Sequence, residues 1–413
     1  MHRASLFLLA LLVTASFGVH GRSTATADPS SGRAIEGPLS TKGARIVDAG
    51  GRTVVLQGVN WFGFETGNHV VHGLWTRDYK EMLAQIRRAG FNTIRLPFSL
   101  EALRSKTIAG VDFSNGKNAD LRGATPLQAM DAIVHEAARQ RLTILLDNHS
   151  GPDDGYQAPL WYGQGYSEDD WVAAWKMLAA RYRDDANVIG ADLKNEPHGE
   201  ATWGTGGATD WRRAAERAGN AVLSVNPRWL ILVEGIEGSV PGGKLSGSWW
   251  GGNLEGVRTA PVRLSRPDRI VYSPHEYGPG VFYQPWFQGS DVAGALADRW
   301  QKGFGYIADQ GIAPLLVGEF GGRDVGLDTA EGRWQRQFLD YLSRTGASWT
   351  YWSWNPDSGD TGGVLNDDWT SVNQPKLELL QQTIAHKAIA YRPGARRHHR
   401  VERLGEAAEL DSG

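Results

Sequence analysis

Apolar positions along the chain form two alternating patterns, short continuous runs and longer stretches in which apolar residues recur every three or four positions. Short runs are typical of buried strands, and the longer stretches are typical of amphipathic helices. The predicted strands span residues 55–60, 92–97, 142–147, 188–193, 229–234, 269–273, 314–318 and 348–353. The predicted helices span residues 78–89, 126–140, 168–183, 209–225, 292–310, 331–345 and 373–389.

This alternation predicts an α/β fold, a (β/α)8 TIM barrel in which each strand is followed by a helix. The alternative is an open doubly wound sheet, which commonly carries a G-x-G-x-x-G turn after an early strand. No such turn follows an early strand here, so the barrel is favoured. Ahead of the first barrel strand, residues 46–48 and 53–55 flank a Gly-containing turn and predict a small β-hairpin that plugs one end of the domain.

The two ends of the chain differ in composition from the domain between them. Residues 1–27 combine His2 and Arg3, an apolar run too short to span a bilayer, and a terminal Ala25-Thr26-Ala27. This order predicts a secretory signal peptide, with an uncleaved N-terminal anchor as the alternative. The protein is therefore expected in the extracellular space or the periplasm, with no membrane contact once the signal is removed.

Beyond the signal, residues 28–42 are rich in Ser, Gly and Pro and predict a flexible segment, and residues 43–390 form the predicted barrel. Residues 391–413 begin with five arginines against one glutamate. Such a charge run predicts a solvated, disordered terminus, with an interaction segment as the alternative.

Composition excludes several classes of protein. The chain has 413 residues, a formal net charge of −3, 41 % hydrophobic residues and no Cys. A thiol nucleophile, a disulfide framework and a Cys-ligated metal are therefore excluded. The near-neutral charge gives no basic face for nucleic acid, so no nucleic-acid partner is expected. The 17 tryptophans suggest a different partner, because indole rings serve both core packing and ligand stacking.

Polar residues follow the predicted strands at the points where each strand ends. In a barrel these carboxyl ends face the active site. The sequence places there, in order, Asn60 and Trp61, Arg95, Asp147-Asn148-His149, Asn195-Glu196-Pro197, His275-Glu276-Tyr277, Gly318-Glu319-Phe320 and Trp352. Ordinary loop bonding explains any one of them, whereas a series at successive strand ends indicates a site.

Two of these residues, Glu196 and Glu319, leave the fourth and seventh predicted strands. Carboxylates at those ends are expected about 5–5.5 Å apart, the separation found in retaining glycosidases. Such a pair splits its pKa values, so that one acid stays ionised and the other stays protonated. An aspartyl-type dyad or a metal site is the alternative. A metal would require further converging ligands, but the polar set is mostly hydrogen-bond donors and aromatics, so neither a metal nor a cofactor is expected.

Taken together, these motifs resemble those of glycoside hydrolase family 5, from about Gly58 to Trp369. The resemblance is carried by Ile94-Arg95-Leu96-Pro97, Asp147-Asn148-His149, Asn195-Glu196-Pro197, His275-Glu276-Tyr277, Gly318-Glu319-Phe320-Gly321 and Tyr351-Trp352-Ser353-Trp354-Asn355-Pro356. Further motifs resemble the secreted bacterial endo-β-1,4-glucanases, or cellulases, of that family: Gly58-Val59-Asn60-Trp61-Phe62-Gly63, Gly73-Leu74-Trp75 and Trp250-Gly251-Gly252-Asn253-Leu254.

The resemblance implies a role for each matching residue. It implies that Glu196 is the general acid/base and Glu319 the nucleophile of a retaining double displacement. The residues it implies for substrate binding are Arg95 and Tyr277 beside the nucleophile, Asn195 at the 2-hydroxyl, His149 and His275 in the same subsite, and Trp352 beneath the sugar.

The remaining tryptophans fall into two groups. Trp61 and Trp250 are expected to contact sugar, with local packing as the alternative, and the same choice applies to Trp161, Trp203, Trp249 and Trp286 in other predicted loops. The tryptophans on predicted helices are expected in the core: Trp171, Trp175, Trp211, Trp300 and Trp334.

The sequence and the resemblance together predict a monomeric, secreted endo-β-1,4-glucanase whose partner is a β-1,4-glucan. The chain lacks the Pro/Ser/Thr-rich linker and binding module of many secreted cellulases, so soluble or amorphous glucan is the expected form of substrate. The alternatives are another β-glycanase, acting on mixed-linkage glucan, mannan or xyloglucan, and a catalytically silent glycan-binding barrel.

Overall fold

The computed structural model describes residues 35–153 and 157–386, so the predicted signal peptide and the basic tail lie outside the described residues. Parallel strands form one sheet in the order β10-β11-β4-β5-β6-β7-β8-β9. Their bounds are β4 Gln57–Asn60, β5 Thr93–Ser99, β6 Thr143–Ser150, β7 Val188–Asp192, β8 Leu230–Val233, β9 Ile270–Tyr272, β10 Leu316–Val317 and β11 Ser348–Tyr351. Two isolated bridges, Tyr272 with Leu315 and His275 with Glu319, join the two end strands and close the sheet. The predicted barrel is confirmed.

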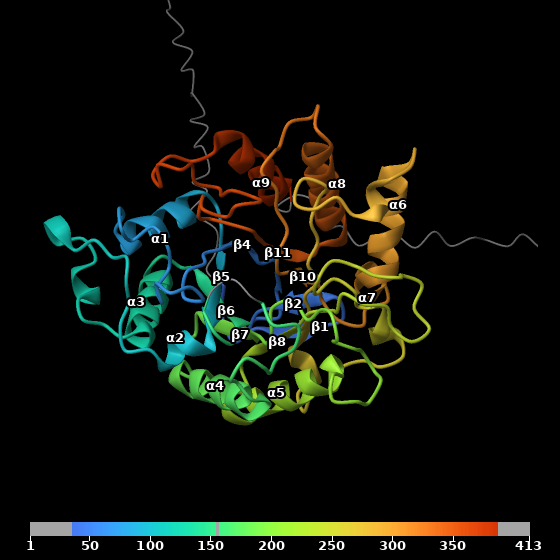
Figure 1. Ribbon diagram of the computed structural model, residues 1–413, viewed down its shortest axis with the longest axis horizontal. Helices are drawn as coiled ribbons and strands as arrows, with labels where there is room; N and C mark the ends of the chain where they lie inside the picture. Colours follow the sequence, from blue (N-terminus) through green and yellow to red (C-terminus); the bar gives the residue numbers. More distant parts are fainter. Residues whose placement is uncertain (1–34, 154–156, 387–413) are drawn as a thin grey trace, which may run out of the picture.

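Helices surround this barrel on the outside (Figure 1). Their bounds are α1 Tyr79–Arg88, α2 Leu100–Arg104, α3 Pro126–Arg139, α4 Glu168–Arg181, α5 Trp211–Val225, α6 Val292–Trp300, α7 Tyr306–Asp309, α8 Ala330–Thr345 and α9 Gln374–His386. The short α2 was not predicted, and the helix expected over 292–310 is interrupted by a π-helical turn at Gln301–Gly305. In the described part of the chain, none of the helices is both long and apolar enough to cross a membrane.

The local sequence explains where these helices start. Thr125 and Gln128 form a capping box, and Pro126 occupies the first turn of α3, where its missing N–H costs nothing. On α4, α5, α6 and α8 the predicted core tryptophans are all buried: Trp171, Trp175, Trp211, Trp300 and Trp334. Their indole rings fill the layer between the helices and the barrel.

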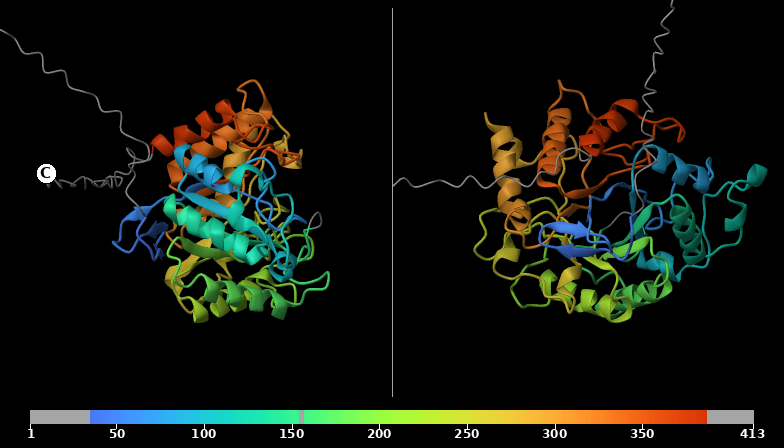
Figure 2. Two further views of the ribbon diagram at one scale, coloured as in Figure 1. Left: turned by 90° about the vertical axis from the view of Figure 1, so that its left-hand side faces the viewer. Right: turned by 180° about the vertical axis from the view of Figure 1, so that it is seen from behind.

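A small antiparallel sheet lies outside one end of the barrel (Figure 2). The predicted hairpin is present as β2 (Arg45–Val47) and β3 (Thr53–Val54). A third strand, β1 (Ser40–Lys42), pairs with β2 and was expected to belong to the flexible segment. It was missed because three polar residues carry no alternating apolar pattern. Leu39 and Ile46 pack against the barrel interior, so the sheet plugs that end as predicted.

The tight approach of β4 and β5 generates a test of the barrel. A Cβ on Gly58 would lie 2.0 Å from the carbonyl oxygen of Thr93, its partner in the neighbouring strand. Gly58→Ala should therefore cost more than the about 1–3 kcal/mol of ordinary overpacking. Thermal unfolding measures this loss, with Gly238→Ala as control because no atom lies within 4 Å of its added Cβ. Equal melting temperatures for the two variants would contradict this close packing.

Candidate active site

A cleft of about 630 Å³ opens at the carboxyl ends of the barrel strands. Its lining residues are His149, Gln157, Glu196, Glu237, Trp249, Trp250, Tyr277, Val281, Phe282, Gln284, Glu319, Trp352, Ser358 and Asp360. The lining therefore includes six of the ten predicted site residues. Three others, Arg95, Asn195 and His275, are fully buried and contact this set from beneath.

The two glutamates face each other in this cleft. Glu196 follows β7 and Glu319 follows β10, and one carboxylate oxygen of each lies within 4.8 Å of the other. His275 bridges them, with Nδ1 3.1 Å from Glu196 Oε1 and 3.7 Å from Glu319 Oε2. This spacing suits direct attack by one carboxylate on a sugar carbon, because it leaves no room for an intervening water.

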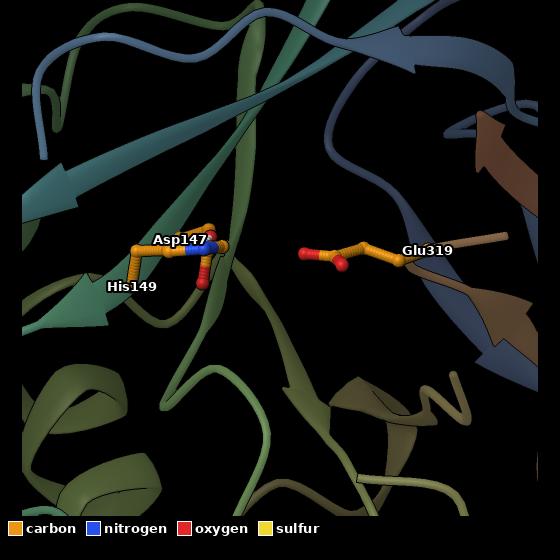
Figure 3. A group of neighbouring side chains, drawn as sticks. All are labelled: Asp147, His149 and Glu319. Atoms are coloured by element: carbon orange, nitrogen blue, oxygen red, sulfur yellow. Dashed lines mark hydrogen bonds and ion pairs between the residues drawn. The ribbon is translucent and has the colours of Figure 1, made fainter. Parts of the chain in front are cut away.

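Glu319 is surrounded by donors. Arg95 Nη1 donates to its Oε1 at 2.7 Å, and the Tyr277 hydroxyl donates to its Oε2 at 2.8 Å. Figure 3 shows the carboxylate of Glu319 pointing across the barrel toward Asp147 and His149. Burial by itself would raise the pKa of Glu319, but the charges of His275, Arg95 and His149 outweigh burial and lower this pKa. Glu319 is therefore held ionised.

Glu196 has the opposite electrostatic environment. Burial raises the pKa of Glu196 to about 7. The hydrogen bond from His275 lowers this pKa, whereas the negative charge of Glu319 raises it further. The pair therefore combines a proton donor with an anion at neutral pH.

The backbone of Glu196 is also unusual, because its φ is +51°, in the left-handed region. A non-glycine residue there costs about 1–3 kcal/mol and persists only where the surroundings hold it. Here the Glu196 N–H donates to Glu234 Oε2 at 2.7 Å, and the Glu196 carbonyl oxygen lies 2.7 Å from His198 Nδ1.

Arg95 connects the whole floor of the cleft. Its guanidinium contacts four buried carboxylates, at 2.7 Å from Glu319, 2.9 Å from Asp192, 3.1 Å from Asp147 and 3.2 Å from Glu234. One cation cannot compensate four anions in a buried site, so some of these acids retain a proton. Burial raises the pKa of Asp192 to about 6 and the pKa of Glu234 well above its usual range.

Asp192 and Glu234 were not among the predicted site residues. Asp192 is the last residue of β7, and Glu234 directly follows β8. A carboxylate at the end of an otherwise apolar strand was the available signal. A search for carboxylates at the ends of apolar strands would have found both residues.

Asn195 and His149 are oriented by hydrogen bonds to neighbouring polar side chains. Asn195 Oδ1 accepts from Arg95 Nη2 at 3.0 Å, and Asn195 Nδ2 donates to Gln157 Oε1 at 2.9 Å. His149 Nδ1 lies 2.7 Å from Asp147 Oδ2. Burial by itself would lower the pKa of His149, but the negative charge of Asp147 outweighs burial and raises this pKa. Gln157 lines the cleft and was not anticipated, because it lies in a loop without a recognisable motif.

Trp352 and Trp250 both line the cleft. Trp352 stacks on Phe62 with ring centroids 5.2 Å apart and planes 8° apart, and it also stacks on His149. Trp250 is 41 % exposed and stacks on His198, with centroids 3.8 Å apart. Both rings are therefore backed by a second flat ring, which holds their orientation.

Trp61 corrects the prediction that it contacts substrate. It is fully buried, and its indole Nε1 donates to the carbonyl oxygen of His72 at 3.0 Å. The loop after β4 folds back over it, as the hydrogen bond from His72 N to Phe62 O shows. Trp161 and Trp203 are buried as well, whereas Trp249 lines the cleft.

Some of these carboxylates and histidines lie close enough to share a metal ion. The clusters are Asp147 with His149 and Glu319, Asp192 with Glu234 and His275, and Glu196 with His275 and Glu319. In each of the three clusters a carboxylate already accepts from the Arg95 guanidinium, Glu319 in two of them and Asp192 in the other. A resident guanidinium opposes a second cation at the same oxygens, so the absence of a metal remains our prediction.

The Arg95 cluster generates a stability prediction. Removing the cation from buried carboxylates costs about 3–5 kcal/mol, so Arg95→Met should lose about this much at pH 7. The pKa values of Asp147 and Glu319 are lowered in the folded protein. Their stabilisation is present above the unfolded pKa and disappears as pH falls through the folded pKa, so the difference from wild type should narrow in acid.

Denaturant unfolding of both proteins from pH 7 to about pH 2.5 measures this difference, because the folded pKa values of Asp147 and Glu319 lie below their ordinary values of 3.8 and 4.5. Arg344→Met is the matched control, because Arg344 forms an exposed pair with Asp340 that is worth at most about 1 kcal/mol. A pH-independent loss in Arg95→Met would mean that packing, not charge, explains the role of Arg95.

Comparison with known proteins places the chain in a family. The model named Cellulase (glycosyl hydrolase family 5) matches residues 47–358. The chain is 49 % identical to an endoglucanase from Paenibacillus polymyxa over 380 residues, covering 92 % of this chain and 94 % of that protein. It is 47 % identical to the major extracellular endoglucanase of Xanthomonas campestris over 340 residues, covering 82 % and 69 % of the two chains.

A solved structure shares the fold as well as the sequence. This crystal structure, a cellotetraose complex of the endocellulase from Pyrococcus horikoshii, matches with a TM-score of 0.78 and 41 % identity, covering 85 % of this chain and 100 % of that one. The chain therefore belongs to the cellulases of glycosyl hydrolase family 5 and is a glycoside hydrolase, an endoglucanase.

Proposed function

We propose that this endoglucanase hydrolyses internal β-1,4 bonds of glucan by double displacement, with Glu319 as nucleophile and Glu196 as acid/base. The observation that carries the proposal is the carboxylate pair itself. The two groups lie within 4.8 Å, and their pKa values are shifted in opposite directions. A structural neighbour that binds cellotetraose supports a glucan chain as the substrate.

In the first step, the Glu319 carboxylate attacks the anomeric carbon and the glycosidic bond breaks. The proton of Glu196 passes to the departing sugar oxygen, leaving Glu196 ionised and the glycosyl group esterified to Glu319. The transition state resembles an oxocarbenium ion, and a preorganised anion beneath it lowers its energy. Arg95 and Tyr277 hold that anion in place before the substrate arrives.

In the second step, a water molecule enters on the side of Glu196. The ionised Glu196 takes a proton from this water, whose oxygen attacks the anomeric carbon and releases Glu319. Two displacements on opposite faces restore the β configuration. Glu196 is protonated again at the end and is ready for another cycle.

The remaining polar and aromatic residues are assigned to substrate binding. Asn195 Oδ1 accepts from Arg95 and one Nδ2 hydrogen is donated to Gln157, so the second Nδ2 hydrogen is the part of the amide assigned to the 2-hydroxyl. Trp352 supports the sugar at the cleavage point, and His149 completes its polar contacts. Trp250 forms a second platform farther along the cleft.

We also infer that the protein is secreted and acts as a monomer. The predicted signal peptide and the extracellular relative in Xanthomonas campestris support secretion. We assign residues 43–390 to the catalytic domain and residues 391–413 to a basic tail.

The two glutamate roles predict different mutant behaviour. Glu319→Gln should abolish turnover of every β-glucoside by several orders of magnitude, whatever the leaving group. Glu196→Ala should lose activity on cello-oligosaccharides, yet still form a glycosyl-enzyme from a dinitrophenyl cellobioside, whose leaving group needs no proton. Added azide needs no general base, so it should release a β-glycosyl azide from Glu196→Ala.

Product analysis separates the outcomes of this experiment. A β-azide formed by Glu319→Gln and not by Glu196→Ala would reverse the two assignments. Near-normal activity of both variants on carboxymethylcellulose would refute the whole proposal.

The opposite pKa shifts predict a bell-shaped dependence of kcat/KM on pH. Activity requires ionised Glu319 and protonated Glu196, so it should fall at acidic pH as Glu319 gains a proton. It should also fall as pH rises through about 7, where Glu196 loses its proton. Cellotetraose should show both limbs, and dinitrophenyl cellobioside should lack the basic limb. A basic limb of equal size on both substrates would contradict the role of Glu196.

A further inference from the structure

Glu234 is a fully buried glutamate beneath the cleft that the proposed reaction does not use. It directly follows β8 and is not among the residues that line the cleft. Its contacts nevertheless reach both halves of the catalytic pair. Oε2 accepts from the peptide N–H of Glu196 at 2.7 Å, and Oε1 lies 3.2 Å from Arg95 Nη2 and 3.2 Å from His275 Nε2.

The contact with Glu196 acts on the backbone. Glu196 has a left-handed φ, and its N–H is directed at Glu234. Gly251 closes the other side, because a Cβ there would lie 2.4 Å from Glu234 Oε2 and 3.3 Å from Glu196 Cα. The Glu234 carboxyl group therefore has little freedom to move, and the peptide it holds carries the proposed proton donor.

The contact with His275 acts on the side chain of Glu196. His275 Nδ1 faces two carboxylates, Glu196 and Glu319, and the second of these is held ionised. A ring nitrogen between two acceptors must carry a hydrogen, so Nδ1 is the donor. A neutral imidazole then has an acceptor at Nε2. Within the described residues Nε2 has no aligned hydrogen bond, and the carboxylate beside it is Glu234.

A proton between Glu234 Oε1 and His275 Nε2 satisfies this arrangement in either of two forms. If the proton lies on Glu234, the acid donates to a neutral imidazole. If it lies on His275, the imidazolium faces an ionised Glu234. Both forms leave Nδ1–H directed at Glu196 Oε1, so the acidic proton of Glu196 is kept on its other oxygen.

We propose that Glu234 is a positioning residue for the proton donor, holding the peptide of Glu196 and fixing, through His275, the oxygen of Glu196 that carries the acidic proton. The proposal rests on the proposed function, because it requires Glu196 to be the donor. The charged and titratable groups that face Glu234 from the surrounding elements are Arg95, Asp147, Asp192, Lys194, Glu196, His275 and Glu319. The surplus of acids over cations in this group favours a shared proton.

Two nearly isosteric variants test the proposal. Glu234→Gln keeps a hydrogen-bond donor for His275 and an acceptor for the Glu196 N–H but loses the acceptor for Arg95 Nη2. Glu234→Met keeps only the length of the side chain. Glu234→Met should lower kcat/KM on cellotetraose by about 100-fold, the size of a lost general-acid contribution, and lower it less than about 10-fold on dinitrophenyl cellobioside. Glu234→Gln should keep the wild-type ratio between the two substrates and the wild-type basic limb.

Glu255→Gln is the matched control. Glu255 is buried and also accepts from two loop N–H groups, those of Lys244 and Leu245, but it has no contact with the catalytic pair. The ratio of kcat/KM between the two substrates and the basic limb of the pH profile should both stay unchanged in this variant. The control therefore distinguishes a general loss of loop order from a misplaced proton on Glu196.

An equal loss on both substrates in Glu234→Met, or a changed substrate ratio in Glu234→Gln, would overturn the proposal. If Glu234→Met does not fold, Glu234→Gln decides alone, because a Glu234 that acts on Glu196 by its charge, and not through the contact with His275, predicts a changed ratio in that variant. Glu196→Ala is assayed in parallel. If it fails to discriminate between the substrates, the assignment of Glu196 has failed, and if it discriminates while Glu234→Met does not, only the role of Glu234 has failed.

Discussion

The buried guanidinium of Arg95 is the interaction on which the cleft depends. It contacts four carboxylates that come from four different strand ends, and one of them, Asp192, has no other role in the proposed reaction. A buried guanidinium requires nearby negative charge, and buried carboxylates require nearby positive charge, so Arg95 and these acids stabilise one another. The strands are therefore tied together at the end of the barrel where the reaction takes place.

This arrangement also explains how one site holds two glutamates in different protonation states. Glu319 accepts a hydrogen bond from the Arg95 guanidinium directly, whereas Glu196 has no direct contact with Arg95 and is linked to it through other buried side chains such as Glu234. Burial raises the pKa of a carboxyl group unless a nearby positive charge opposes it. The same degree of burial thus leaves one group ionised and the other protonated, without any difference in residue type.

Much of the fold and part of the site could be predicted from the sequence. Apolar runs and helical periodicity located the barrel strands and most of the helices, because both patterns are local consequences of burial on one or two faces. The short polar strand β1 and the helix α2 were missed, since three to five residues carry too little pattern. The site was predicted where polar residues left apolar strands, as at Arg95, Glu196 and Glu319.

Trp61 and Gln157 mark what only the tertiary structure decided. Whether Trp61 points into the cleft or under a loop depends on how residues far along the chain pack over it, and the structure places it in the core. Gln157 reaches the cleft from a loop that carries no motif. The sequence by itself determined which residue types stand at the strand ends. The closed barrel determined their distances, and therefore their pKa values, because electrostatic interaction and desolvation depend on separation in space and not on separation along the chain.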